Sequence, residues 1–250
     1  MEFGASTAHN CLKKALDSGN MAKQLNRSSK FNTEQERLAQ VQALFACEQD
    51  LYDAGAKVIV CIDEVGRGAL AGPVSAAAVV LGPDWQPVLG LRDSKQISAK
   101  QREELAVALT DNVQAWHVAH VDAGYIDEHG IVPALRRAML CAVEGLQLDY
   151  APDKVLIDGL PMKLFEQEIA IVKGDSKVAG IAAASILAKV ARDALMVAAD
   201  ADYGGYGFVS NKGYGSIAHR TAIVQQGLSS IHRRSFCQKI LESGNQEELF

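Results

Sequence analysis

Three short apolar segments of the chain each lead into an acidic residue with a glycine close by. The segments cover residues 57–62, 155–157 and 169–172. The acidic residues that follow them are Asp63 with Glu64, then Asp158, and finally Asp175. Short runs rich in Val and Ile predict buried strands, and strand carboxyl ends in an α/β sheet converge on one edge. The sequence therefore predicts a cluster of carboxylates along one edge of a sheet.

The remaining periodicity completes an α/β pattern. Further strands are predicted over residues 74–81 and 113–121, and helices over 134–148 and 178–199. Ser98 is expected to cap another helix, and the segment between the last two strands could also be helical. The order β-β-α-β-α-β-α-β-α predicts a mixed central sheet flanked by helices on both faces, followed by a helical C-terminal part.

Composition changes divide the chain into five expected segments. They are a flexible tail over residues 1–31, an N-terminal helical extension over 32–56, a catalytic domain over 57–202, a helical C-terminal part over 203–243 and a flexible tail over 244–250. Five cysteines lie without C-x-x-C spacing, which favours a reducing compartment over a disulfide framework. With no signal peptide or bilayer-spanning segment recognised, we expect a cytoplasmic protein without a membrane partner.

Charge is unevenly distributed along the chain. The formal net charge is −5 at pH 7, which excludes a polybasic, histone-like protein. Residues 205–239, however, hold five basic and no acidic residues. A cationic segment of this kind suits a nucleic-acid phosphate backbone. The average charge therefore does not exclude a nucleic-acid substrate.

The predicted carboxylate cluster requires compensation of its charge. Taken alone, Asp63 ahead of Gly66 fits an ordinary turn equally well, but three strand ends built alike favour a site. Clustered like charges cannot all stay ionised without a cation. Mg²⁺ prefers oxygen ligands and substrate phosphates, and the lack of His and Cys in the cluster argues against zinc. Two divalent ions can promote phosphodiester hydrolysis.

The loop after the first predicted strand contains Gly66, Gly68 and Gly72. Their spacing, G-x-G-x-x-x-G, does not match the dinucleotide-binding fingerprint, and no G-x-x-x-x-G-K-[ST] motif occurs. The glycines could instead let backbone amides approach a sugar-phosphate chain closely, with Arg67 on a phosphate.

A series of short motifs extends along residues 56–236. They are Asp63-Glu64-Val65-Gly66-Arg67-Gly68 with Leu70-Ala71-Gly72-Pro73-Val74, Asp93-Ser94-Lys95, Ile157-Asp158-Gly159, Lys173-Gly174-Asp175, Ala182-Ala183-Ala184-Ser185-Ile186 with Lys189, Arg192 and Asp193, and Asn211-Lys212-Gly213-Tyr214-Gly215 with His219. In this order they resemble the ribonuclease HII family. Ala69 and Ser216 stand where the family usually has Pro and Thr, which leaves the preference for an RNA–DNA junction open.

The resemblance implies a ribonuclease H-like fold with a catalytic site that holds Mg²⁺ or Mn²⁺. The implied catalytic and metal ligands are Asp63, Glu64, Asp158 and Asp175. The backbone of Gly66, Arg67 and Gly68 would read the ribose 2′-hydroxyl, and Tyr214 would stack on the sugar of the next deoxynucleotide.

Four further polar side chains are candidate phosphate contacts. They are Lys95, Ser185, Lys189 and Arg192. For the last two, a helix whose long side chains extend into solvent is an equally good interpretation.

The function implied by the resemblance is that of an endonuclease. It would hydrolyse the RNA strand of RNA–DNA hybrids and cut 5′ of ribonucleotides embedded in duplex DNA, leaving 5′-phosphate and 3′-hydroxyl ends. Another nuclease of the same fold, such as a junction resolvase, and a non-catalytic hybrid-binding protein are the alternatives. We expect the protein to act as a monomer.

The last five residues form a second candidate binding element. Gln246, Leu249 and Phe250 resemble the short peptide with which bacterial replication proteins dock on the DNA sliding clamp. Gly244 and Asn245 before it are expected to act as a flexible joint, so that an apolar anchor on a mobile tether raises the local concentration at DNA. A solvated, frayed tail is the alternative.

Overall fold

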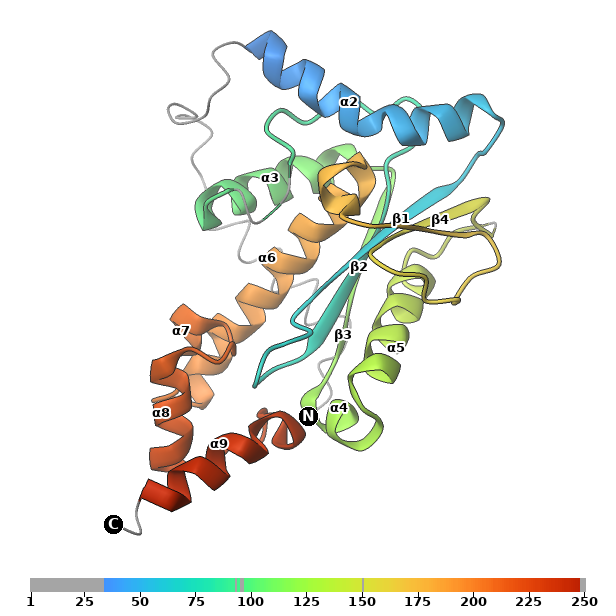
Figure 1. Ribbon diagram of the computed structural model, residues 1–250. Coiled ribbons are helices and arrows are strands. Elements are labelled where there is room, and N and C mark those ends of the chain that lie inside the picture. Colours follow the sequence, from blue (N-terminus) through green and yellow to red (C-terminus); the bar gives the residue numbers. More distant parts are fainter. Residues whose placement is uncertain (1–33, 93, 95–96, 150, 248–250) are drawn as a thin grey trace.

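A five-stranded mixed sheet forms the centre of the protein (Figure 1). The computed structural model describes residues 34–92, 94, 97–149 and 151–247. The strands are β1 (Ile59–Val65), β2 (Val74–Val80), β3 (Ala115–Val121), β4 (Lys154–Asp158) and β5 (Glu168–Ile171). In the order β3-β2-β1-β4-β5, β1, β4 and β5 are parallel, whereas β2 is antiparallel to both of its neighbours. The predicted mixed sheet is confirmed.

Three helices cover one face of the sheet. They are α2 (Glu34–Asp53), α3 (Ala99–Asn112) and α6 (Ala179–Asp202). Side chains alternate between faces along a strand, and Ile59 and Cys61 of β1 point into this layer with Leu156 of β4. The Ala-rich α6 packs on β1 and β2 and is buried along most of its length, as its sequence predicts. We call this side of the sheet the α6 face.

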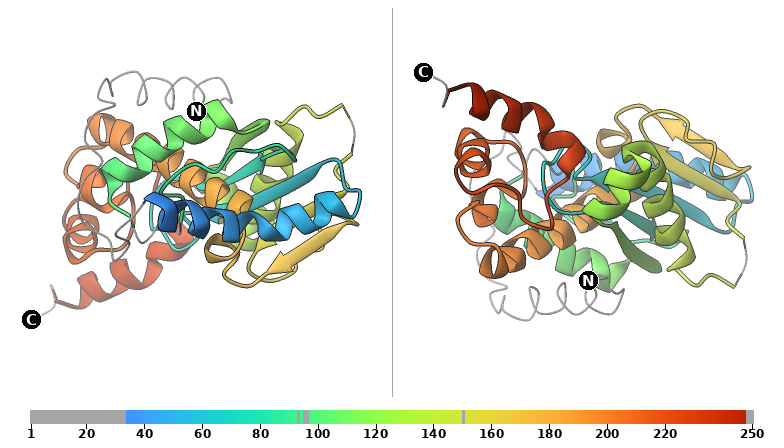
Figure 2. Two further views of the ribbon diagram at one scale, coloured as in Figure 1. Left: turned by 90° about the horizontal axis from the view of Figure 1, so that it is seen from above. Right: turned by 90° about the horizontal axis from the view of Figure 1, so that it is seen from below.

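Two helices cover the opposite face, which we call the α5 face. They are α4 (Ala123–His129) and α5 (Ile131–Glu144). Val60 and Ile62 of β1 point into this second core with Val155 and Ile157 of β4. In Figure 2, α2 is near the viewer from above and α5 is near the viewer from below, so the sheet is enclosed on both sides.

The C-terminal helices form a third small core beside the C-terminal half of α6 (Figure 1). A 3₁₀ turn, η2 (Gly174–Ser176), precedes α6, and the helices after it are α7 (Phe208–Asn211), α8 (Ile217–Gln226) and α9 (Arg234–Glu247). Met196 of α6 packs there with Phe208 and Ile223. The third core places the cationic segment against the helix that crosses the sheet.

Local signals in the sequence account for several element boundaries. Ser98 caps α3 as predicted, since its hydroxyl accepts a hydrogen bond from the Gln101 amide in a complete capping box. The helix predicted over residues 134–148 begins earlier, at Ile131, and a separate α4 precedes it across Gly130.

The connection between β4 and β5 differs from the prediction, because residues 159–167 contain no helix. The carboxylate of Glu168 accepts hydrogen bonds from the backbone amides of Met162, Lys163 and Leu164. A side chain therefore satisfies donors that a helix would otherwise pair internally.

The C-terminal boundary also differs. Helix α9 extends to Glu247 and includes Gly244 and Asn245, which were expected to form a flexible joint. Continued i to i−4 backbone pairing carries the helix past the glycine. No described helix is both long and apolar enough to cross a bilayer.

Candidate active site

Two of the predicted carboxylates lie side by side on the α6 face. Asp63 belongs to β1 and Asp158 ends β4, one residue beyond the last paired positions of these parallel strands, Ile62 and Ile157. Asp63 follows Cys61 by two residues, so the period of the strand places it on the α6 face. The same alternation applies to Asp158, two residues after Leu156. The sheet therefore brings these two carboxylates together.

Asp175 joins this edge from η2, the turn that leads into α6. The amide of the neighbouring Gly174 donates a 2.6 Å hydrogen bond to Oδ1 of Asp158. A Cβ atom at Gly174 would lie 2.6 Å from Cδ1 of Ile181 and 3.3 Å from the same Asp158 oxygen. A glycine is thus needed for the close approach between the turn and the end of β4.

Asp63 is a buried carboxylate with acidic neighbours. Its side chain is only 5% exposed, and its Oδ1 accepts a 2.7 Å hydrogen bond from the Glu64 amide. Burial and the negative charges of Glu64 and Asp158 raise the pKa of Asp63 well above its ordinary value, although a hydrogen bond from Ser185 partly opposes the shift. An ionised carboxylate there requires a nearby cation.

Glu64 occupies a different position from the other three carboxylates. As the residue after Asp63 in β1, it follows the alternation toward the α5 face and is half-buried. Among the described residues, no three Asp, Glu, His or Cys side chains surround a common point as metal ligands would. The structure thus brings Asp63 and Asp158 together, with Asp175 in the adjoining turn, whereas Glu64 leaves the strand on the other side, and a metal site of four carboxylates stays a prediction.

The chemistry of the cluster nevertheless fits a divalent cation. Every candidate ligand is a carboxylate oxygen, the donor that Mg²⁺ and Mn²⁺ prefer. The raised pKa of Asp63 reflects its burial first, and then the negative charges of Glu64 and Asp158. A divalent ion would remove this repulsion and draw the carboxylates toward it.

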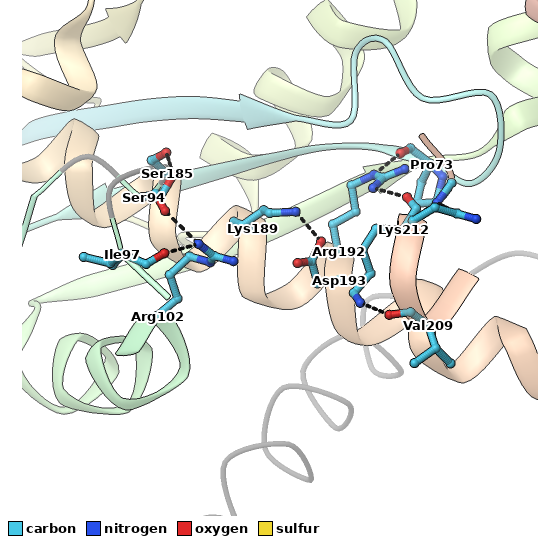
Figure 3. A network of polar contacts seen from close by, with 12 residues as sticks. Pro73, Ser94, Ile97, Arg102, Ser185, Lys189, Arg192, Asp193, Val209 and Lys212 are labelled. Carbon is cyan, nitrogen blue, oxygen red and sulfur yellow. Dashed lines mark hydrogen bonds and ion pairs between the residues drawn. The ribbon is translucent and has the colours of Figure 1, made fainter. Parts of the chain in front are cut away.

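Helix α6 carries three of the four predicted phosphate contacts, Ser185, Lys189 and Arg192, along one side (Figure 3). Ser185 is buried next to Asp63, and its hydroxyl lies 2.9 Å from that of Ser94. Lys189 forms a 2.6 Å ion pair with Asp193 one turn further on. Lys95, which follows Ser94 in the chain, lies outside the described residues.

Arg192, one turn after Lys189, has a role that the sequence did not predict. Its guanidinium is fully buried and donates hydrogen bonds to three backbone carbonyls, those of Pro73 at 2.8 Å, Lys212 at 2.8 Å and Ala71 at 3.1 Å (Figure 3). Neither a phosphate contact nor a solvent-facing position is compatible with this burial. Arg192 instead joins the loop after β1 to the segment before Tyr214.

The loop after β1 contains the glycines predicted to read a ribose. Gly66 has a φ of 87° and is buried against Arg192, whose Nε would lie 2.2 Å from a Cβ atom at this position. Arg67 and Gly68 are exposed, and a Cβ at Gly68 would meet nothing within 4 Å. The loop is fixed on its inner side and open on its outer side, where a polynucleotide could approach.

A second buried arginine, Arg233, was missed at the sequence level. Its Nε donates to the Gly72 carbonyl at 3.0 Å, and one terminal nitrogen donates to the Arg67 carbonyl at 3.1 Å. Burial and the nearby charge of Arg192 lower the pKa of Arg233 to about 9. Its only sequence signal was its place in the cationic segment, because its partners are distant in the chain.

Tyr214 lies between α6 and the C-terminal core. Its ring is 36% exposed, with the cationic groups of Arg192 and Lys189 at 5.3 and 5.8 Å from the ring centroid. Its carbonyl lies 2.9 Å from Nδ1 of the buried His219. His219 therefore has a structural contact with the segment of the tyrosine.

The candidate clamp-binding residues cannot be placed in this site. Leu249 and Phe250 lie outside the described residues, as does the side chain of Gln246.

Comparisons with known proteins agree with this geometry. The family model "Ribonuclease HII" matches residues 60–239. A ribonuclease HII of Listeria monocytogenes serotype 4a is 43% identical over 207 residues, which cover 83% of this chain and 78% of that protein. The structure of ribonuclease H2 from Pyrococcus horikoshii OT3 has a TM-score of 0.61 at 28% identity and covers 76% of this chain and 99% of its own.

A further similar structure is a PCNA:RNase HII complex from Archaeoglobus fulgidus. It has a TM-score of 0.59 at 26% identity, over 70% of this chain and 93% of that one. The family model extends from β1 into α9 and so includes the whole sheet and most of the C-terminal part. The chain therefore has a ribonuclease H-like fold, belongs to the ribonuclease HII family and is a ribonuclease H.

Proposed function

We propose that this protein cuts the RNA strand of RNA–DNA hybrids and also cuts 5′ of single ribonucleotides embedded in duplex DNA. One observation carries the proposal: α6 lies beside the carboxylates through Ser185 and holds both recognition segments through Arg192. A catalytic edge and a sugar-reading surface share one rigid helix. Such an arrangement fits a nuclease whose cleavage position depends on recognition of one ribose.

The carboxylates are assigned the catalytic role. Asp63, Asp158 and Asp175 would hold Mg²⁺ or Mn²⁺ on the α6 face, with Glu64 completing the set from the end of β1, and the metal would supply positive charge to a phosphodiester under attack by water. The proposed products carry 5′-phosphate and 3′-hydroxyl ends. Ser185 orients Asp63 through its hydroxyl, and Gly174 orients Asp158 through its amide. These two contacts reduce the freedom of the carboxylates.

Recognition of the substrate is assigned to the two segments that Arg192 joins. The outer side of Gly66-Arg67-Gly68 would contact the ribose 2′-hydroxyl, the group that distinguishes RNA from DNA at a given position. Tyr214 presents a partly exposed ring for stacking on the neighbouring deoxyribose. Lys189, half-buried beside this ring, and Lys95 would contact phosphates. The enzyme is proposed to act as a monomer.

A duplex that carries one ribonucleotide tests the proposal directly. The expected result is a single cut 5′ of the ribonucleotide in Mg²⁺ or Mn²⁺, and none after addition of EDTA. The matched control is the all-DNA duplex of the same sequence. Cleavage of all-DNA junctions would favour a resolvase-like nuclease. Tight hybrid binding without cleavage in either metal would favour a binding protein.

The C-terminal peptide is proposed to bind the DNA sliding clamp. The support is the peptide itself, Gln246 with Leu249 and Phe250, together with the likeness to a ribonuclease HII that was solved in a complex with PCNA. Deletion of residues 246–250 should abolish capture of the enzyme by immobilised clamp while cleavage of the short duplex is retained. Capture that survives the deletion would refute the assignment.

A further inference from the structure

The N-terminal helix α2 inserts a carboxylate into the core of the protein. Glu48 is 1% exposed, although Glu is rarely buried without a partner. Its Oε1 accepts a 2.7 Å hydrogen bond from the backbone amide of Gly180, 132 residues further along the chain. Oε2 has no hydrogen-bond partner among the residues that the structure describes. The contact with Gly180 is therefore the principal compensation for burying this side chain.

Gly180 lies in the first turn of α6, and that helix has no cap of its own. The first four amides of a helix lack partners within it. The N-cap residue of α6 is Val178, whose side chain makes no capping hydrogen bond. Gly180 is the second residue of the helix, one of the two positions whose amides an N-cap side chain normally satisfies. Glu48 supplies the missing acceptor from another element.

The packing around this contact leaves little space. A Cβ atom at Gly180 would lie 2.5 Å from Sγ of Cys61 and 3.2 Å from Oε1 of Glu48. Cys61 Sγ itself lies 3.9 Å from the same Glu48 oxygen. Helix α2, strand β1 and helix α6 therefore meet at one point, two residues before Asp63 in β1.

We propose that Glu48 caps α6 in place of a local residue and is thereby a positioning residue for the catalytic carboxylates. The inference rests on the proposed function, because it concerns the same site. The start of α6 lies between Asp175, four residues before the helix, and Ser185 in its second turn, which contacts Asp63. Movement of this turn would displace both carboxylates.

The recognition segments are held at a different place. Arg192 and Arg233 bind them through backbone carbonyls at the other end of the site. Loss of the cap should therefore lower kcat and leave KM almost unchanged, because the carboxylates move while the substrate-reading loops do not.

Four variants test the role of the cap. Glu48→Leu removes the acceptor at similar volume, Glu48→Gln retains an acceptor oxygen, and Asp50→Asn is the control, since it removes an exposed carboxylate from the same helix. The fourth is the double variant Glu48→Leu with Val178→Thr. Thr has nearly the shape of Val, and the extended backbone at this position (φ −131°, ψ 123°) suits an N-cap hydroxyl.

The expected readouts are cleavage kinetics and hydrogen exchange of residues 177–187. Glu48→Leu should lower kcat by about tenfold or more, since misplacement by about 1 Å can cost about 100-fold, and should speed exchange in the first turn of α6. Glu48→Gln and Asp50→Asn should match the wild type. The double variant should recover both kcat and protection.

Three results would contradict the capping role of Glu48. Wild-type kinetics and exchange in Glu48→Leu, an equal defect in Glu48→Gln, or no recovery in the double variant would each overturn the capping role. If Glu48→Leu does not fold, the double variant decides, because a local cap should restore folding. If the wild-type protein cuts no ribonucleotide-containing duplex, the proposed function fails. Hydrogen exchange of residues 177–187 would then still show whether Glu48 caps α6.

Discussion

The two ends of the site balance their charges in opposite ways. At the carboxylate end, Asp63 is buried beside Glu64 and Asp158, and its burial, together with their repulsion, raises its pKa. At the recognition end, Arg192 and Arg233 are fully buried, yet both donate to backbone carbonyls. Arg192 is satisfied by carbonyls of the chain and Arg233 is so in part, since its Nη2 has no hydrogen-bond partner among the described residues. At the carboxylate end, neighbouring negative charges instead disfavour the ionised form of Asp63.

This difference indicates which part of the site is ordered before a metal ion or substrate binds. Carbonyl acceptors hold the arginines in one geometry, so the loops they bind are organised before substrate arrives. Under the proposed function, the carboxylate end would acquire its working geometry only when a cation offsets its charge. Substitutions at the recognition end should therefore affect folding, and substitutions at the carboxylate end should affect catalysis.

Asp63→Asn should have the largest effect on activity. It removes a central carboxylate of the proposed metal site, and cleavage of the one-ribonucleotide duplex should fall by more than about 100-fold, because even outer-shell partners of a metal are worth about 10- to 100-fold. The melting temperature in EDTA should stay close to that of the wild type, since Asn has the same shape without the repelling charge. Full activity in this variant would remove the distinction between the two ends.

Arg192→Met should produce the largest loss of stability. Three carbonyls would lose their donor, at about 1–3 kcal/mol for each buried group left unpaired, so we expect a loss of about 4 kcal/mol in unfolding by urea. Arg137→Met is the control, because that guanidinium is exposed over the Tyr125 ring, and its unfolding curve should coincide with that of the wild type. An unchanged curve for Arg192→Met would mean that the carbonyls find other donors.

Glu48 belongs to neither end of the site, and it should make the stability of the fold depend on pH. Burial raises its pKa from 4.5 to about 7. The folded protein therefore keeps this proton to higher pH than the unfolded chain does, and the resulting stability is complete below pH 4.5 and lost as pH rises through about 7. At about 1.4 kcal/mol per pH unit, the loss is about 3 kcal/mol.

Unfolding of the wild type and Glu48→Gln across this pH range measures that contribution. The difference between their free energies of unfolding should decline from pH 4.5 to 7 and then level off. A constant difference would show that Glu48 titrates normally in the folded state.

Tyr214→Ala should have the smallest of these effects. Stacking on an aromatic side chain is worth about 1–3 kcal/mol per nucleotide, so kcat/KM on the one-ribonucleotide duplex should fall by about tenfold. Tyr214→Phe keeps the ring and should match the wild type. If Phe and Ala behave alike, the hydroxyl rather than the ring contributes to recognition.

Much of the fold could be predicted from the sequence, because its signals are local. Strand-forming runs of Val and Ile predicted β1 and β4. Ser98 identified the start of α3, because its capping partner Gln101 is only three residues away. The connection before Glu168 could not be predicted, because a side chain several residues away satisfies its amides. A local pattern does not record where such a side chain will point.

The candidate site divides in the same way. The sequence by itself determined which carboxylates end or follow strands, since the period of a strand is a local property. The parallel register that places Asp63 beside Asp158 joins segments far apart in the chain and was decided by the tertiary structure. Only the tertiary structure decided how charges are compensated. Arg192 and Pro73 are separated by 119 residues, and Glu48 and Gly180 by 132. Partners at that separation are set by the packing of whole elements, because burial selects whichever donors and acceptors the surrounding backbone happens to present.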